Sequence, residues 1–106
     1  MLSEYLNYIQ ENNNIETITF PKDEWNSVKR RLNEGKKVHS IRVDKEYGKY
    51  KLGQIYKTEW GQLVKVIGIK RLKSINEYLY FNELTPEQSE YLKNKNKLEH
   101  ITIKKE

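Results

Sequence analysis

The hydrophobic and polar positions in the first third of the chain follow two periods, one helical and one alternating. They predict a helix over 3–11, a strand over 15–20 and a helix over 22–34. In the second helix Trp25, Val28 and Leu32 fall on one face, which we expect to pack on the core. Gly35 ends this helix, because glycine readily adopts the left-handed conformation found after a helix C-terminus.

The remainder of the chain has mostly strand-like patterns. These predict strands over 36–43, 54–58, 62–73 and 98–103, and helices over 74–81 and 85–93. The strand over 62–73 is apolar on both faces in places, so we expect it to be central, and Gly68 within it predicts a bulge or a bend. Thr85 and Pro86 are typical of an N-cap and a first helical position.

The order of these elements predicts the fold class. A chain of 106 residues forms one core, so we expect a single domain over 1–106, with 1–14 as a helical extension and 15–106 as the body. Short strands with glycines between them, and helices at the ends, favour an α+β domain: a small β-barrel or a strongly curved mixed sheet with flanking helices. A doubly wound fold is excluded, because no helical crossovers separate the strands over 36–73.

The amino-acid composition and the absence of known motifs limit which kinds of catalytic or binding site we expect. The chain has no Cys and two His, which excludes disulfides and thiol nucleophiles and disfavours a metal site. It contains no phosphate-binding glycine loop, no HExxH and no nucleophile elbow. No apolar run is long enough to span a membrane, and the first residues lack a signal-peptide pattern. We therefore expect a cytoplasmic protein with no cofactor, no metal and no membrane partner.

Charge is unevenly distributed along the chain. Residues 1–27 carry one lysine and five acids, whereas residues 28–73 carry fourteen Lys or Arg and four acids. Such a basic segment suits an anionic partner, most simply nucleic acid or a nucleotide. The alternative is a solvated, lysine-rich surface, since Lys outnumbers Arg sixteen to four.

The segment over 20–56, FPKDEWNSVKRRLNEGKKVHSIRVDKEYGKYKLGQIY, resembles the ASCH domain of the PUA-like superfamily. The motifs that match are Gly35-Lys36-Lys37, Ser40-Ile41-Arg42 and the turn Tyr50-Lys51-Leu52-Gly53-Gln54-Ile55. Val38 and Gln54 depart from the family pattern, which has Thr and Asp there. The resemblance implies a PUA-like barrel with a cleft between helix and barrel. The nearest branch contains small N4-acetylcytidine amidohydrolases.

That branch also implies three catalytic candidates, Lys37, Ser40 and Glu83, with Glu77 as an alternative to Glu83. A desolvated Lys can act as a base and a nearby Ser as a nucleophile. In an ideal strand, however, residues 37 and 40 face opposite sides of the sheet. The structural alternative is that all three are ordinary surface or strand residues.

The basic strand and the loop after it predict a nucleic-acid surface. Its candidate residues are Lys36, Lys37, His39, Arg42, Tyr47, Lys49, Tyr50 and Lys51. Cations interleaved with aromatic rings can hold a backbone while the rings stack on bases. Two alternatives are structural: Arg42 pairs with Asp44 or Glu46, and Tyr50 plugs the mouth of the barrel.

Three functions follow from these patterns. The first is a nucleic-acid-binding domain, RNA above all, or a nucleotide-binding domain that uses a basic cleft. The second is a small amidohydrolase acting on N4-acetylcytidine-type nucleosides. The third is a protein-interaction module, compatible with a phage-encoded chain, that uses Tyr5 and Tyr8 of the N-terminal segment. We favour the first because charge and resemblance both support it.

Overall fold

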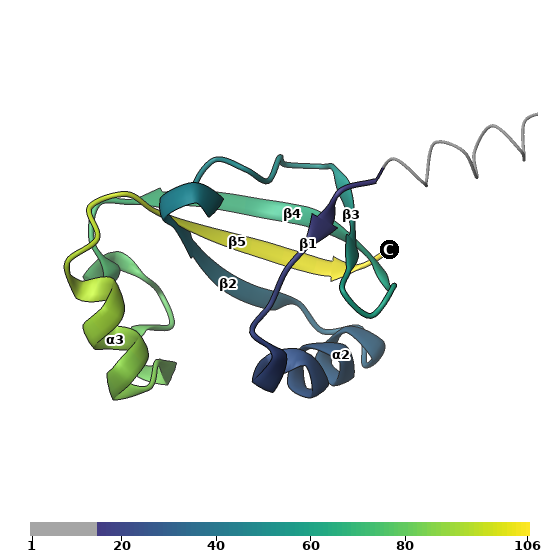
Figure 1. Ribbon diagram of the computed structural model, residues 1–106, viewed down its shortest axis with the longest axis horizontal. Helices are drawn as coiled ribbons and strands as arrows, with labels where there is room; N and C mark the ends of the chain where they lie inside the picture. Colours follow the sequence, from purple (N-terminus) through teal and green to yellow (C-terminus); the bar gives the residue numbers. More distant parts are fainter. Residues whose placement is uncertain (1–14) are drawn as a thin grey trace, which may run out of the picture.

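A computed structural model of the protein describes residues 15–106, which form one mixed five-stranded sheet with the helices near one of its edges (Figure 1). The strands are β1 (Thr17–Ile18), β2 (Val38–Val43), β3 (Ile55–Thr58), β4 (Leu63–Leu72) and β5 (Leu98–Lys105). Their order is β1-β3-β4-β5-β2; β1 and β3 are parallel and all other neighbours antiparallel. The predicted helix over 3–11, and with it the extension over 1–14, lies outside the described residues.

The expected α+β domain with a mixed sheet is confirmed, and its central strand is β4. Within residues 15–106 the sheet is not closed into a barrel, because β1 and β2 form its two edges. The barrel form of the prediction is therefore not confirmed. The predicted bulge is confirmed, since the pairing of β4 with β5 shifts between Val66 and Gly68. A Cβ at Gly68 would come within 3.4 Å of the Thr102 Cβ, so this position leaves little room for a side chain.

Two helices flank the sheet. A 3-10 turn over Lys22–Glu24 leads into α2 (Trp25–Asn33), which turns Val28 and Leu32 inward as its spacing predicts. α3 (Pro86–Lys93) begins at Thr85, whose side chain accepts a hydrogen bond from the Gln88 amide while the Gln88 side chain accepts one from the Thr85 amide. This capping box satisfies two backbone donors that a helix otherwise leaves unpaired.

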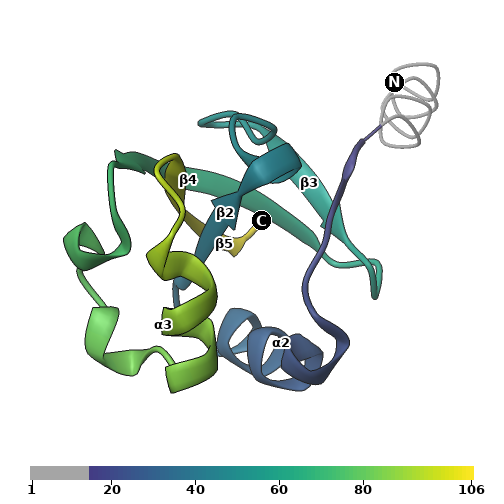
Figure 2. The ribbon, with the colours of Figure 1, turned by 60° about the vertical axis from the view of Figure 1, so that its left-hand side comes forward.

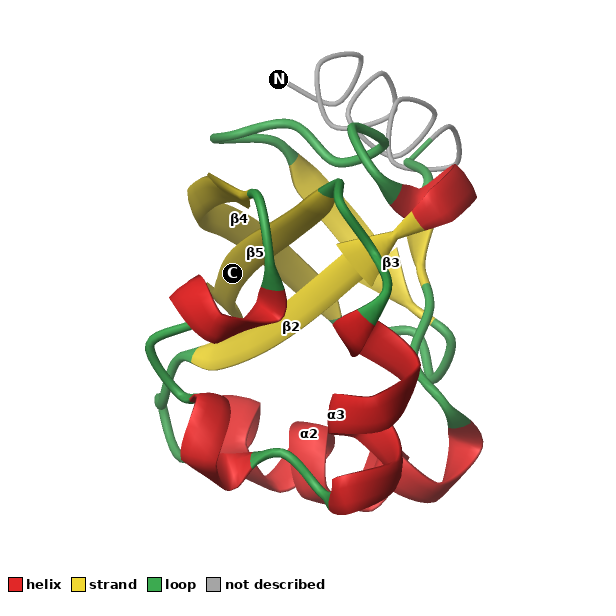
Figure 3. Ribbon diagram, turned by 90° about the vertical axis from the view of Figure 1, so that its left-hand side faces the viewer, coloured by secondary structure: helices red, strands yellow, loops and turns green. Residues whose placement is uncertain are grey.

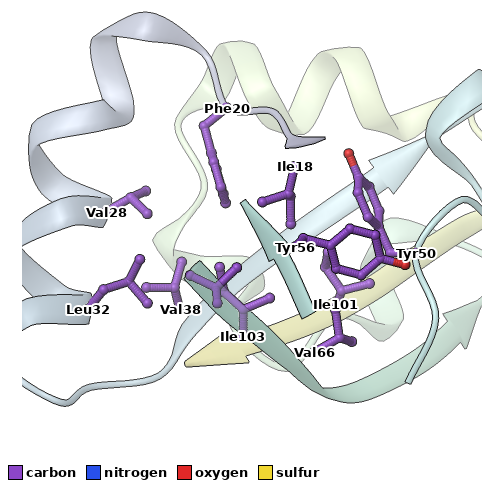
Figure 4. Packing of buried hydrophobic residues seen from close by; sticks show 11 residues of the cluster. Ile18, Phe20, Val28, Leu32, Val38, Tyr50, Tyr56, Val66, Ile101 and Ile103 are labelled. Atoms are coloured by element: carbon purple, nitrogen blue, oxygen red, sulfur yellow. The ribbon is translucent and has the colours of Figure 1, made fainter. Parts of the chain in front are cut away.

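The helices pack on opposite faces of the sheet, because directly opposed residues on neighbouring strands share a face. On the face that we call the α2 face, Val28 and Leu32 meet Val38, Ile103 and the residues around them (Figure 4). On the other face, the α3 face, Leu92 packs with Leu72 and Leu98. Both helices nevertheless lie on the β2 side of the sheet (Figures 1 and 3).

The predicted helix over 74–81 is wrong. The chain there makes two separate 3-10 turns, Ile75–Glu77 and Phe81–Glu83 (Figure 2). Between them Tyr78 is extended and its ring is buried beside His100. Packing of these aromatic side chains on the sheet thus overrides the local helical preference. Among residues 15–106, no helix is long and apolar enough to cross a membrane.

Candidate functional site

A pocket of about 290 Å³ lies along the free edge of β2, between the chain that enters α2 and the chain that forms α3. Its position follows from the fold: α2 and α3 pack on opposite faces and leave a space beyond the edge strand. Three segments line it: Phe20, Pro21, Glu24 and Val28; Val38 to Val43; and Tyr78, Leu84, Gln88, Tyr91 and Leu92. The wall is therefore mostly apolar and aromatic, with a few polar groups at defined places.

Arg42 is the basic residue of this wall. It is 7% exposed, and its Nη1 donates a 2.7 Å hydrogen bond to the carbonyl of Thr19 and lies 3.5 Å from Glu46 Oε1. The guanidinium carbon lies 4.9 Å from the centroid of the Phe20 ring and 5.0 Å from that of Tyr50. Burial lowers the pKa of Arg42, whereas Tyr50 and Glu46 act in the opposite direction.

Two other donors of Arg42 are unused. Within residues 15–106, Nε and Nη2 are buried and have no hydrogen-bond partner. An unpaired donor of a buried charged group costs about 1–3 kcal/mol or more. Buried side-chain polar atoms without a hydrogen-bond partner are uncommon in folded proteins, so these two nitrogen atoms need an explanation.

Glu46 holds Arg42 in place. Its Oε1 accepts hydrogen bonds from the Thr19 hydroxyl at 3.0 Å and the Tyr50 hydroxyl at 3.1 Å, and its Oε2 pairs with Lys49 at 3.2 Å. Burial acts to raise the pKa of Glu46, but the hydrogen bonds from Lys49, Thr19 and Tyr50 outweigh it and hold the pKa below its usual range. The carboxylate therefore stays ionised beside the guanidinium.

Glu24 is the residue that supplies a carboxylate to the pocket wall itself. Burial, and then the charge of Asp23, raise its pKa, while the charge of Arg42 lowers it. Ser40 and Gln88 add a hydroxyl and an amide to the same wall. Together with Arg42, these groups offer hydrogen-bond donors and acceptors around a space with apolar sides.

The Phe20 side of the pocket is fixed by backbone hydrogen bonds. The amide of Phe20 donates to Glu59 Oε1 at 2.7 Å, and its carbonyl accepts from Trp25 Nε1 at 2.9 Å. The Trp60 ring packs 6.0 Å from Phe20 and 5.7 Å from Trp25. Trp60 is therefore folded back onto the core and holds this wall of the pocket.

The predicted nucleic-acid residues fall into two groups. Arg42 and His39 line the pocket. Lys36, Lys37, Lys49 and Lys51 do not line it: Lys36 pairs with Glu34 at 2.8 Å, Lys49 with Glu46, and the Lys51 amine donates to the Gly48 carbonyl.

The two predicted stacking tyrosines are also placed differently from each other. Tyr50 is 1% exposed and packs edge-on against Tyr56, so its ring belongs to the core and is not free to stack on a base (Figure 4). Tyr47 is half-buried, with its ring 5.8 Å from the Arg71 guanidinium.

The three catalytic candidates are not brought together in the pocket. Ser40 lines it, whereas Lys37 and Glu83 are exposed and do not. Lys37 and Glu83 instead both act on His39. Burial, followed by the charges of Arg31 and Lys37, lowers the pKa of His39, and the charge of Glu83 opposes this effect.

A histidine pair at the pocket edge is absent from the sequence-based predictions. His39 Nδ1 lies 2.9 Å from His100 Nε2 and 3.1 Å from the Thr102 hydroxyl, and the Tyr80 ring packs 4.6 Å from His39. The alternating pattern of the two segments predicts both strands, but it does not predict how the strands pair. The register between β2 and β5 brings the two histidines together. In the described part of the chain, no group of three or more His, Cys, Asp or Glu is placed to hold a metal ion.

No protein-family model, curated protein or solved structure matches this chain. Function must therefore be argued from the pocket and its surroundings.

Proposed function

We propose that this protein is a nucleic-acid-binding domain, with RNA as the favoured ligand, or a nucleotide-binding domain, and that one base occupies the pocket beside β2. The observation that carries this proposal is that Arg42, whose buried Nε and Nη2 have no hydrogen-bond partner within residues 15–106, is one of the residues that line the pocket. The resemblance of residues 20–56 to ASCH domains of the PUA-like superfamily supports the same function.

Arginine suits this role because its planar fork donates two hydrogen bonds to one acceptor edge. Phosphate oxygens and the O6/N7 edge of guanine are such acceptors. Arg42 is held on its Nη1 side by Thr19 and Glu46, whereas Nε and Nη2 are buried without a partner, so the guanidinium must shift toward the pocket before a ligand can reach them. A ligand atom that accepts a hydrogen bond from Nε or Nη2 removes the free-energy cost of leaving these donors unpaired. This gain adds to the binding affinity, and no additional charged residue is needed.

The size and walls of the pocket suit a flat ring. A volume of about 290 Å³ is at the small end of ligand pockets, which run from roughly 300 to 1,000 Å³. This is room for one base. Phe20 and Tyr78 supply aromatic surface, and Glu24 and Gln88 supply groups that can read the polar edge of the base.

The two alternative functions have less support. For an amidohydrolase of N4-acetylcytidine-type nucleosides, only Ser40 of the three candidates lies on the pocket wall. For a protein-interaction module, Tyr5 and Tyr8 lie outside the described residues. We therefore propose neither as the primary function.

The test compares wild type with Arg42→Lys, which keeps the charge and loses the fork. Binding of a fluorescently labelled single-stranded RNA and of nucleoside monophosphates is measured at low and moderate salt. We expect wild type to bind and Arg42→Lys to bind about 5- to 150-fold more weakly, because a bidentate base contact contributes about 1–3 kcal/mol.

Thermal unfolding controls for loss of structure in the buried Arg42 variant. Ligand binding should raise the melting temperature of wild type more than that of Arg42→Lys. If neither RNA nor any nucleotide binds wild type, or if binding is unchanged in a folded Arg42→Lys protein, the proposal is wrong.

A further inference from the structure

The α3 face of the sheet carries lysines from four neighbouring segments. Lys65 of β4 lies directly opposite Lys104 of β5 in the strand register. Because Val38 pairs with Ile103 in the antiparallel register of β2 and β5, Lys37 lies beside Lys104 of the neighbouring strand. The set that we call the lysine face consists of Lys37, Lys57, Lys65, Lys70 and Lys104.

The register places Lys57 and Lys70 on this face as well. Lys57 of β3 lies opposite Leu63, two residues before Lys65 in β4. Lys70 lies opposite His100 of β5. Because alternate residues of a strand share a face, these positions lie on the same side of the sheet as Lys65 and Lys104.

The acid nearest to these lysines in the strand register is Glu106, which follows β5 and whose amide donates to the Leu63 carbonyl, level with Lys57. Glu99 is the one acidic residue within β2 to β5, and it lies on the α2 face opposite Arg42 and Arg71. Within residues 15–106, none of the five lysines makes an ion pair. The ion pairs seen there use Lys36, Arg42, Lys49, Arg71 and Lys95.

Like charges directly opposite each other on neighbouring strands destabilise a sheet. Lys65 and Lys104 are therefore an unfavourable pair in the free protein, and a bound anion would relieve their repulsion. Across three strands about 4.8 Å apart, the row Lys37, Lys104 and Lys65 spans about 10 Å.

The lysine face begins where the packing under α3 ends. Tyr80 and Tyr78 cover His39 and His100, and the strands beyond them show partly exposed Thr102 and exposed Lys104. His39 also lines the pocket and lies two residues from Lys37 on the same face. His39 therefore links the pocket wall to the lysine face at the edge of β2.

We propose that the lysine face binds the phosphate backbone of a single-stranded nucleic acid whose base occupies the pocket. This inference rests on the function proposed above and assigns the path of the strand. Phosphate contact is favoured over base stacking, because within residues 15–106 the open part of this face presents lysines with Ile55 and Leu63 but no aromatic ring. An aromatic platform is what stacked single-stranded bases require.

The test uses the double variant Lys65→Gln/Lys104→Gln and the labelled single-stranded RNA. Each lost phosphate contact lowers the slope of log affinity against log salt by about 0.7, so we expect the slope to fall by about 1.4. At roughly 0.1 M salt, this corresponds to about fivefold weaker binding for each lysine. Lys65→Arg/Lys104→Arg keeps the charge and should bind like wild type.

The matched control is Lys29→Gln/Lys93→Gln, which removes the same charge from exposed positions on α2 and α3. Its salt slope should stay within experimental error of wild type. A slope in the sheet variant no lower than in this control overturns the inference. If Arg42→Lys still weakens binding in that case, the pocket proposal survives while the strand path fails.

Vesicles that contain phosphatidylserine and a poly-glutamate peptide form two further arms. If the sheet variant loses binding to either of them but keeps its RNA binding, the face serves a membrane or an acidic protein, and the inference is wrong. Absence of RNA binding by wild type also overturns it, whereas the proposed function fails in that case only if no nucleotide binds wild type either.

Discussion

The Tyr50 ring packs against the Arg42 guanidinium, with 5.0 Å between its centroid and the Arg42 Cζ. The Tyr50 hydroxyl donates to Glu46 Oε1, the same atom that lies 3.5 Å from Arg42 Nη1. The three side chains thus form one unit in which Tyr50 orients both charges. This arrangement makes Tyr50 a support for the pocket wall.

Tyr50→Phe should reduce stability while leaving the ring against Arg42. The lost hydrogen bond to Glu46 is expected to cost about 1 kcal/mol, measured as the free energy of unfolding in urea. Tyr47→Phe is the control, because its ring lies beside Arg71 and its hydroxyl makes no hydrogen bond within residues 15–106. Equal stability of Tyr50→Phe and wild type would show that the unit does not need this hydroxyl.

Glu99 and Arg71 form an ion pair, and we expect Glu99 to contribute more than Arg71 to the stability of the fold. Glu99 is 1% exposed and its Oε1 accepts the Gly48 amide at 3.0 Å, whereas the Arg71 side chain is 71% exposed. Glu99→Ala leaves the Gly48 amide unpaired and opens a cavity, so we expect a loss of about 2–4 kcal/mol. Arg71→Ala should cost less than about 1 kcal/mol, as exposed ion pairs do.

Chemical denaturation of the two single variants measures both values. The loop over 44–51 should also lose amide-exchange protection in Glu99→Ala, because Glu99 anchors it through Gly48. Similar losses in both variants would contradict the assignment of Glu99 as the anchor.

Removing the N-cap of α3 should destabilise the domain. Thr85→Ala loses the acceptor for the Gln88 amide, and such caps contribute typically about 1 kcal/mol. Thr85→Ser keeps the hydroxyl and should lie within a few tenths of wild type. Since α3 carries Gln88, Tyr91 and Leu92 to the pocket, Thr85→Ala should also weaken nucleotide binding. A loss in Thr85→Ser as large as in Thr85→Ala would assign the effect to packing.

The histidine pair predicts loss of stability on mild acidification. Burial lowers the pKa values of both His39 and His100 below their ordinary value of 6.5. A group whose pKa is lower in the folded state binds protons better when unfolded. Stability is therefore complete above about pH 6.5 and falls as pH is lowered through the folded-state pKa values.

The measurement is the urea midpoint between about pH 7.5 and pH 5 for wild type and for His39→Gln/His100→Gln. The charged groups that act on the pair are Arg31, Lys37 and Glu83 around His39, and Lys70 near His100. The double variant should lose the pH dependence in this window. The loss of stability linked to Glu46, whose pKa is lowered in the folded protein, begins only below its ordinary pKa of 4.5. Identical pH profiles for the two proteins would rule out the histidines as the cause.

Local features of the chain were predictable because they depend on near neighbours. The apolar spacing of α2, the Thr85 cap of α3, the bulge at Gly68 and the long central strand are all present. The helix over 74–81 was not, because burial of Tyr78 against the sheet decides the conformation there. The strand over 15–20 shortens to Thr17–Ile18, since only these residues pair with β3.

By itself, the sequence determined the class of fold, its strand segments and an excess of positive charge over 28–73. It also singled out Arg42 through its setting in the strand and its resemblance to a family motif. Tertiary structure alone decided that β2 is an edge strand, that Arg42 lines a pocket with two buried nitrogen atoms unpaired within residues 15–106, and that five lysines share one face. The physical reason is strand register: pairing between segments far apart in the chain assigns each side chain to a face, and a shift of one residue would reverse it.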